Sequence, residues 1–191
     1  QSKDQDGSNE GIYARLYDDL GVAQTDEFLV TETTNQEQKE PSVAMDADGN
    51  FVVAWADRRQ PEYDVYARRF GVDGVAADPE FRVNTHVTGD QTLPSVAMDD
   101  DGGFVIAWNS ILQDGDGQGI YAQRYGADGI ALGSEFRVNT FTAGSQEDPS
   151  TAMDADGDFL IAWSSNNQDG DSRGIYAQRY GADGIAAGSE F

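Results

Sequence analysis

The chain has 191 residues, of which 35 are acidic and 12 basic, so its formal net charge at pH 7 is −23. Such a charge repels phosphate backbones and anionic membrane surfaces, which argues against nucleic acid as a partner. Cysteine is absent, which excludes disulfides and thiolate chemistry, and no run approaches the roughly 18 apolar residues that predict membrane insertion.

Internal repetition organises the whole sequence. Three nearly identical segments end at Trp55, Trp108 and Trp163, and these tryptophans are 53 and 55 residues apart. The repeating unit is therefore about 54 residues long and is present about three and a half times. The predicted divisions are a partial unit at 1–40, full units at 41–92 and 93–148, and a unit at 149–191 that is truncated in its last strand.

Each unit predicts four short strands joined by turns. In the unit 41–92, we expect strands at 42–46, 51–56, 64–70 and about 79–84, with a tight turn at 47–50. Helical periodicity is nowhere sustained, because Gly or Pro interrupts almost every window long enough for a helix. The predicted fold class is all-β.

Four antiparallel strands in a unit of this size indicate a β-propeller-like blade. Both faces of an inner strand are then covered, which fits the nearly continuous apolar run at 51–55. In the third strand, Ile120 and Ala122 are expected on one face, with Tyr121 and Tyr125 on the face that packs against a neighbouring blade. The boundaries suggest a window from a longer array, and a dimer completing a seven-bladed ring is a weaker possibility.

The segments 102–108 and 119–140 resemble a tandem repeat of very large secreted bacterial proteins, which often also carry haemolysin-type calcium-binding repeats. That family implies no reaction. The segment 42–70 also resembles the blades of sialidase-like propellers, but the Asp-box position holds a degenerate sequence at 125–132. Arg58 and Arg59 occur in one unit only, so no arginine cluster matches sialidase chemistry and no catalytic residue is transferred.

An acidic tight turn lies between the first two strands of each unit. Alternate aspartates on a glycine turn can direct oxygens towards Ca²⁺, which takes about six to eight oxygen ligands. The alternative, which the sequence favours, is that Asp and Gly only supply hairpin turn chemistry. The third turn is the best metal candidate, because Asn50 and Gly103 replace its last aspartate elsewhere. The candidate ligands are Asp46, Asp48, Asp99, Asp101, Asp154, Asp156 and Asp158.

Longer acidic loops between the second and third strands form a second candidate group. Two of them carry aspartates at D-x-D spacing in a glycine-rich backbone, where carbonyl oxygens can join the carboxylates around Ca²⁺. A plain solvated loop is an equal alternative. A third such loop, 4–11, lies in the partial unit, and the unit 41–92 has a different sequence at 57–64. The candidate ligands are Asp114, Asp116, Asp169 and Asp171.

Arg69, Arg124 and Arg179 recur in the third strand, where ion pairs between blades with Glu80, Glu135 or Glu190 are expected. The main functional prediction is a non-catalytic, extracellular or cell-surface structural or adhesive module, stabilised by Ca²⁺, whose partners are other copies or flanking repeats. An alternative is a carbohydrate-binding propeller that holds extracellular glycans on loop aromatics such as Tyr63. The weakest alternative is a degenerate sialidase-like glycoside hydrolase.

Overall fold

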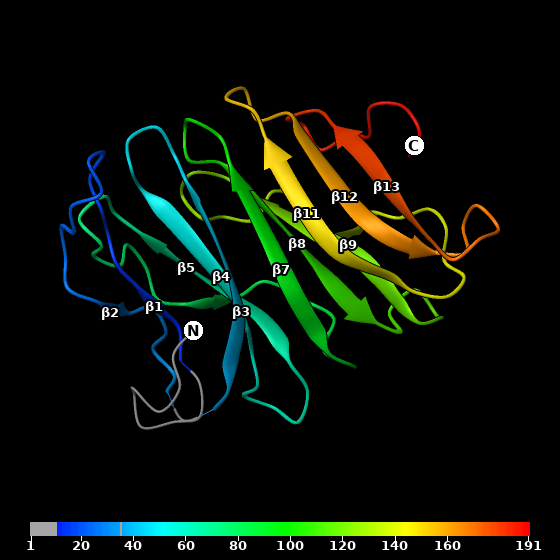
Figure 1. The fold of residues 1–191 in the computed structure, drawn as a ribbon, viewed down its shortest axis with the longest axis horizontal. Coiled ribbons are helices and arrows are strands. Elements are labelled where there is room, and N and C mark those ends of the chain that lie inside the picture. Colours follow the sequence, from blue (N-terminus) through cyan, green and yellow to red (C-terminus); the bar gives the residue numbers. More distant parts are fainter. Residues whose placement is uncertain (1–10, 35) are drawn as a thin grey trace.

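A computed structural model describes residues 11–34 and 36–191 of this chain. The described residues form thirteen strands and no helix. The strands make antiparallel sheets of up to four strands, and these sheets lie side by side (Figure 1). The prediction of an all-β fold of propeller-like blades is confirmed. Over the same residues, no helix is long and apolar enough to cross a membrane.

The sheets follow the repeat. A half-blade contains β1 and β2, a first blade β3 to β6, a second blade β7 to β10, and a third blade β11 to β13. β1 and β2 span Tyr13–Ala14 and Phe28–Leu29, and β3 to β6 span Gln38–Met45, Phe51–Asp57, Asp64–Phe70 and Phe81–Arg82 in that order. β7 to β10 span Gln91–Met98, Phe104–Ile111, Gln118–Tyr125 and Phe136–Arg137. β11 to β13 span Gln146–Met153, Phe159–Asn166 and Arg173–Tyr180.

The innermost strands differ most from the prediction. β3 begins at Gln38, four residues before the expected start, and its pairing with β4 shifts register between Lys39 and Ser42. Pro41 lies inside this shift, and proline cannot donate a ladder hydrogen bond, so the strand bulges there. β7 and β11 have the same shift ahead of Ser95 and Ser150. The outermost strands are shorter than predicted, with two residues each.

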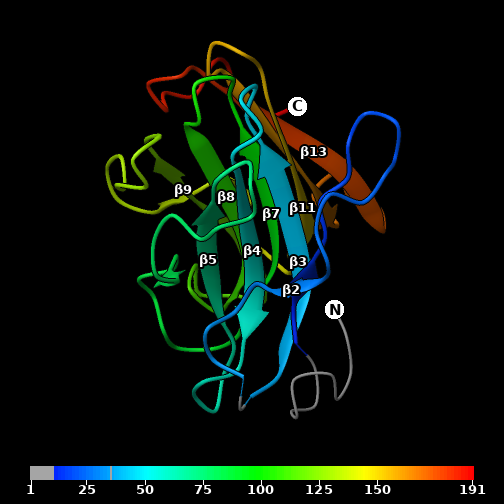
Figure 2. The same ribbon diagram turned by 90° about the vertical axis from the view of Figure 1, so that its left-hand side faces the viewer.

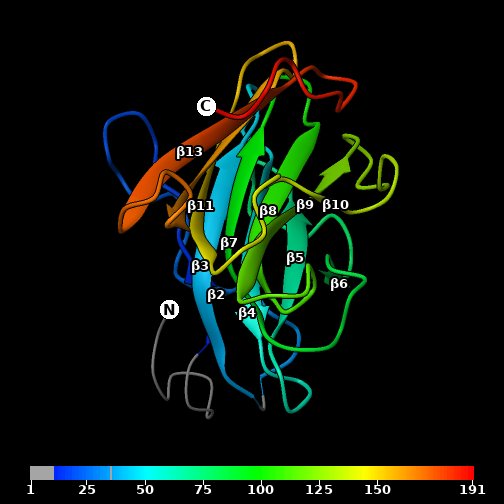
Figure 3. The same cartoon turned by 90° about the vertical axis from the view of Figure 1, so that its right-hand side faces the viewer.

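The core lies between neighbouring blades. Tyr121 and Tyr125 of β9 pack on the first blade, whereas Ile120 and Ala122 pack on the third blade, as the alternation of the strand predicts. The rings of Phe104 and Tyr125 stack with centroids 4.8 Å apart. Figures 2 and 3 show β3, β7 and β11 adjacent to one another, with the outer strands on the far side.

The strands of each blade end at two opposite ends of the molecule, which we call the turn end and the bulge end. The turn end carries the hairpins between the first two strands of each blade, such as 46–50. The bulge end carries the starts of β3, β7 and β11 and the loops between the second and third strands, because Gln38 pairs with Asp57 and Asp57 pairs with Asp64. Each candidate residue belongs to one of these ends.

Candidate functional site

The first aspartate of each acidic turn holds the turn itself. Asp46 Oδ1 accepts hydrogen bonds from the backbone N–H groups of Asp48 at 3.0 Å and Asn50 at 2.8 Å. Asp99 and Asp154 accept the matching pairs in the second and third blades. These bonds are typical of an aspartate that stabilises a local turn.

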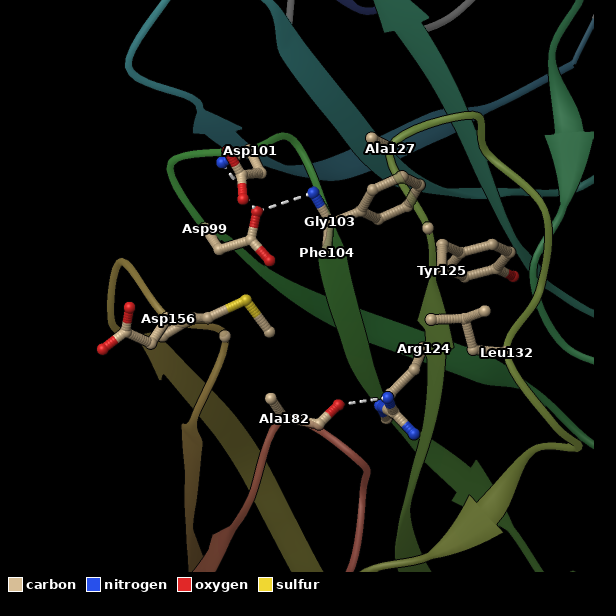
Figure 4. Close-up of a pocket in the computed structure, with 13 residues that line it drawn as sticks. Asp99, Asp101, Gly103, Phe104, Arg124, Tyr125, Ala127, Leu132, Asp156 and Ala182 are labelled. Carbon is tan, nitrogen blue, oxygen red and sulfur yellow. Dashed lines mark hydrogen bonds between the residues drawn. The ribbon is translucent and has the colours of Figure 1, made fainter.

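The second aspartates lie in grooves between blades (Figure 4). Asp99 and Asp101 of one turn and Asp156 of the next line a groove of about 230 Å³, together with Arg124. Arg124 Nη1 donates to the carbonyl oxygen of Asp183 at 2.6 Å. Asp48 and Asp101 line the equivalent groove beside Arg69. Asp154 and Asp158 line a separate hollow on the third blade.

The two aspartates of the D-x-D pair 114–116 contact different residues. Asp114 lies within 3.4 Å of Asn139 Nδ2, whereas Asp116 accepts a hydrogen bond from the N–H of Gly144. A Cβ added to Gly119 would meet Asp114 Oδ2 at 2.7 Å, so this glycine makes room for the carboxylate. In the third-blade loop, Asp169 accepts from the N–H of Asp171.

The first blade explains what Asp114 does. There, Asp64 stands at the position of Gly119, and its carboxylate accepts a hydrogen bond of 2.6 Å from Asn84. Asp114 reaches back from the loop to the asparagine at the same place in the second blade. Within the described part of the chain, no three acidic or histidine side chains converge as metal ligands. Calcium binding by the turns and loops stays a prediction, and the loop 4–11 lies largely outside the described residues.

The predicted ion pairs between the repeated arginines and glutamates are wrong. Arg69 Nη2 donates to the carbonyl oxygen of Ala127 in the next blade at 2.6 Å. Glu80 instead accepts from the N–H of Glu32 in the preceding half-blade at 2.9 Å. Arg69 shares the face of Val65 that meets the following blade, whereas Glu80 lies on the opposite face, because side chains alternate along a strand. Glu135 and Glu190 make the matching bonds to Thr85 and Thr140.

The bulge end carries strained backbone that the sequence interpretation missed. Glu40, Leu93 and Asp148 occupy one register position in β3, β7 and β11, with φ of 57°, 52° and 58°. Left-handed conformations of residues other than glycine are costly and concentrate at functional sites. Two of these three residues are carboxylates, on the innermost strands β3 and β11, and Leu93 lies on β7 between those strands.

Charged neighbours hold these two carboxylates. Glu40 Oε1 lies 3.4 Å from Lys39 Nζ, and Glu40 Oε2 accepts from the N–H of Leu93 at 2.8 Å. Arg173, the first residue of β13, forms an ion pair with Glu147 and lies 3.9 Å from Asp148 Oδ2. The bulge end therefore combines acidic groups with cations, in a protein whose overall charge is strongly negative.

The repeats differ from one another at this end. The residues before the shared Pro-Ser are Lys-Glu, Thr-Leu and Glu-Asp in the three blades, whereas the turn end repeats almost unchanged. A position-by-position comparison of the three repeats could have identified Glu40 and Asp148, since one site on a repeated scaffold must break the repeat. The sequence interpretation singled out the aspartates of the turns and loops instead, and their role as metal ligands stays a prediction.

The first blade has a buried charged cluster beside its loop. Asp57 is fully buried and accepts a hydrogen bond from Arg59 at 2.9 Å, and Arg59 also lies 2.6 Å from Glu80. Burial raises the pKa of Asp57, although Arg59 opposes this effect. In the second blade, Gln113 takes the place of Arg59 and donates to Glu135. This cluster fixes the loop 58–63 at the bulge end.

Tyr63 is less available to sugars than its place in a loop suggested. Its ring is half-buried, and the Lys39 ammonium lies 4.1 Å from the ring centroid. Burial, together with the nearby Glu37, raises the pKa of Tyr63 to about 12. Its hydroxyl therefore remains protonated at neutral pH.

No protein-family model matches this sequence. No curated protein matches it either. Among solved structures, a protein of unknown function from Dyadobacter fermentans aligns with a TM-score of 0.59 and 12% identity, over 81% of this chain and 54% of that one. An endo-arabinase from Bacteroides thetaiotaomicron aligns with a TM-score of 0.54 and 15% identity, over 95% of this chain and 73% of that one. A family 117 glycoside hydrolase from Zobellia galactanivorans aligns with a TM-score of 0.53 and 11% identity, over 90% and 58%.

These structures correct the functional prediction. Proteins with this fold include glycoside hydrolases, so the expectations of a non-catalytic structural or adhesive module and of no enzyme activity are overturned. At these identities the similarity establishes the fold alone. The chain spans only a little over half of the Dyadobacter and Zobellia proteins.

Proposed function

We propose that this chain belongs to a carbohydrate-active propeller that hydrolyses glycosidic bonds at its bulge end. The observation that carries this proposal is the strained, repeat-breaking position that Glu40 and Asp148 occupy on the innermost strands β3 and β11, which lie on either side of β7. The glycoside hydrolases that share the fold support the reaction class.

Glycoside hydrolysis requires two carboxyl groups beside the scissile bond. One protonates the leaving oxygen, and the other attacks the anomeric carbon or activates a water molecule. Glu40 and Asp148 supply this pair in the proposal. Lys39 and Arg173 orient the carboxylates, since each makes an ion-pair contact with one of them.

The substrate partner in this proposal is an extracellular glycan. Hydroxyl groups of a sugar can donate to the carboxylates of the bulge end and accept from its cations. The predicted extracellular or cell-surface location belongs to the same proposal, because polysaccharides of this kind are encountered outside the cell.

The test measures release of reducing ends from a panel of soluble arabinans, xylans, galactans and mannans. Glu40→Gln and Asp148→Asn should each lower the turnover by at least about 100-fold, the scale of general acid–base catalysis. Asp48→Asn removes the same charge at the turn end, and its turnover should remain unchanged.

Binding of the same panel separates cleavage from recognition. Glu40→Gln and Asp148→Asn should still bind the glycan that the unmodified protein cleaves. Binding without any product would assign the carbohydrate-binding alternative instead. A protein that neither binds nor cleaves any member of the panel would overturn the proposal.

A further inference from the structure

The outer face of the third blade is exposed at positions that both preceding blades bury. Ile175 of β13 is 75% exposed, whereas its equivalents Val65 and Ile120 are 0% exposed. Leu160 lies on the same face and pairs with Ala152 on one side and Arg179 on the other. We define the open face as Ala152, Leu160, Ile175 and Arg179.

An aromatic face of the following blade covers the equivalents of the open face. Val52 and Val65 of the first blade share one core cluster with Phe104, Trp108 and Tyr121 of the second. The second blade meets the third in the same way, through Phe159, Ile161 and Trp163. The joint between blades is thus an aliphatic face packed against an aromatic one.

Polar contacts fix the same joint in register. Arg69 and Arg124 donate to carbonyl oxygens in the turn of the following blade. Ser42 Oγ accepts from the N–H of Val96 at 3.1 Å, and Ser95 makes the matching contact with the third blade. Arg179 stands at the same position on the open face, and no residue in 11–34 or 36–191 forms a hydrogen bond or ion pair with its guanidinium group.

The hollow at the open face is larger than the grooves at the equivalent places between two blades. The grooves beside Arg69 and Arg124 have volumes of about 190 and 230 Å³. The hollow beside Arg179 has equivalent lining residues and a volume of about 480 Å³. The turn and innermost strand of the following blade narrow the first two grooves, whereas the third lacks that neighbour.

We propose that the open face docks a further blade of this same repeat. The occupant presents a Phe-x-Ile-x-Trp strand to Leu160 and Ile175, and turn carbonyl oxygens to Arg179. Continuity with the two existing joints supports this occupant. A second copy of this chain fits less well, because its first aromatic face is already packed against Ile12 and Val30 of the half-blade.

Docking has a consequence at the bulge end. Glu40 receives a backbone N–H from Leu93 of the following blade, and Asp148 occupies the equivalent position without such a donor in the described residues. A further blade brings the matching N–H to Asp148. The consequence for catalysis rests on the proposed function, but the docking itself does not.

The experiment appends a second copy of residues 137–191 after Phe191, which continues the repeat in register because Phe136 is the equivalent residue. The chain has no cysteine, so Ala152→Cys provides a single thiol on the open face. Its labelling rate should fall at least about tenfold in the extended chain, because the docked blade must separate from the open face before the reagent can reach the thiol. A thiol at the turn tip, Ala155→Cys, should label equally fast with and without the extension.

Two substitutions test whether the open face causes this protection. Ile175→Asp in the extended chain should restore fast labelling. Ile185→Asp is the matched control, because Ile185 is 68% exposed and its equivalent Ile130 is also exposed, at 65%. The control should leave the slow labelling unchanged.

Three results would overturn the proposal. The first is equal labelling of Ala152→Cys with and without the extension, including the case in which the appended repeat stays unfolded. The second is protection that survives Ile175→Asp. The third is labelling of the unextended chain that slows as its concentration rises, which would assign the open face to a second copy. None of these results depends on glycan cleavage, so failure of the proposed function would be recognised separately.

Discussion

Replacement of Ile120 and Ile175 by alanine should have very different effects on stability. Both residues occupy the same position in the third strand of a blade, but Ile120 is 0% exposed and Ile175 is 75% exposed. Removing three buried carbons at about 0.8 kcal/mol each costs about 2.4 kcal/mol. The cavity left among Val138, Ile161 and Trp163 adds to this cost, so Ile120→Ala should lower the free energy of unfolding by about 3 kcal/mol.

Ile175→Ala should change the free energy of unfolding by less than about 0.5 kcal/mol, as is usual at the surface. Urea denaturation followed by tryptophan fluorescence measures both effects, with m values of about 1–3 kcal/mol/M. The midpoint for Ile120→Ala should therefore fall by about 1 M or more. Equal shifts for the two variants would refute the assignment of the core to the joints between blades.

Three further predictions concern the turns, the buried carboxylate and calcium. Gly129→Ala should lower the free energy of unfolding more than Gly133→Ala does. Both glycines have φ near 80°, but a Cβ at Gly129 would lie 2.7 Å from Arg69, whereas nothing lies within 4 Å of a Cβ at Gly133. Equal free energies of unfolding for the two variants would contradict this prediction. Because burial raises the folded-state pKa of Asp57 above 3.8, its contribution to stability is lost as the pH rises. The unmodified protein should therefore lose stability relative to Asp57→Asn as the pH rises above about 4, and parallel pH profiles would argue against a raised pKa. Calcium at the acidic turns should raise the melting temperature, and an unchanged value when EDTA replaces millimolar Ca²⁺ would reject that prediction.

The sequence could predict the fold because the relevant signals are local. The Asp-Gly turns and the alternation between Ile120 and Tyr121 are properties of short segments, and their repetition about every 54 residues identified the blade. The same logic predicted β5 at its observed bounds, Asp64–Phe70. It was less accurate for β3, because the bulge at Pro41 depends on how β4 lies beside it.

The candidate site could be predicted only in part, because it depends on contacts between segments far apart in the chain. The sequence alone determined that acidic residues occupy the turns and loops and that arginines recur in the third strand. Only the tertiary structure decided where they point: Asp114 turns inward to Asn139, and Arg69 donates to a backbone carbonyl oxygen of the next blade. It also brought Glu40 and Asp148, 108 residues apart, to the same end of the innermost strands β3 and β11, on either side of β7. The physical reason is that the period of a strand fixes which face a side chain occupies, whereas blade stacking fixes what it meets there.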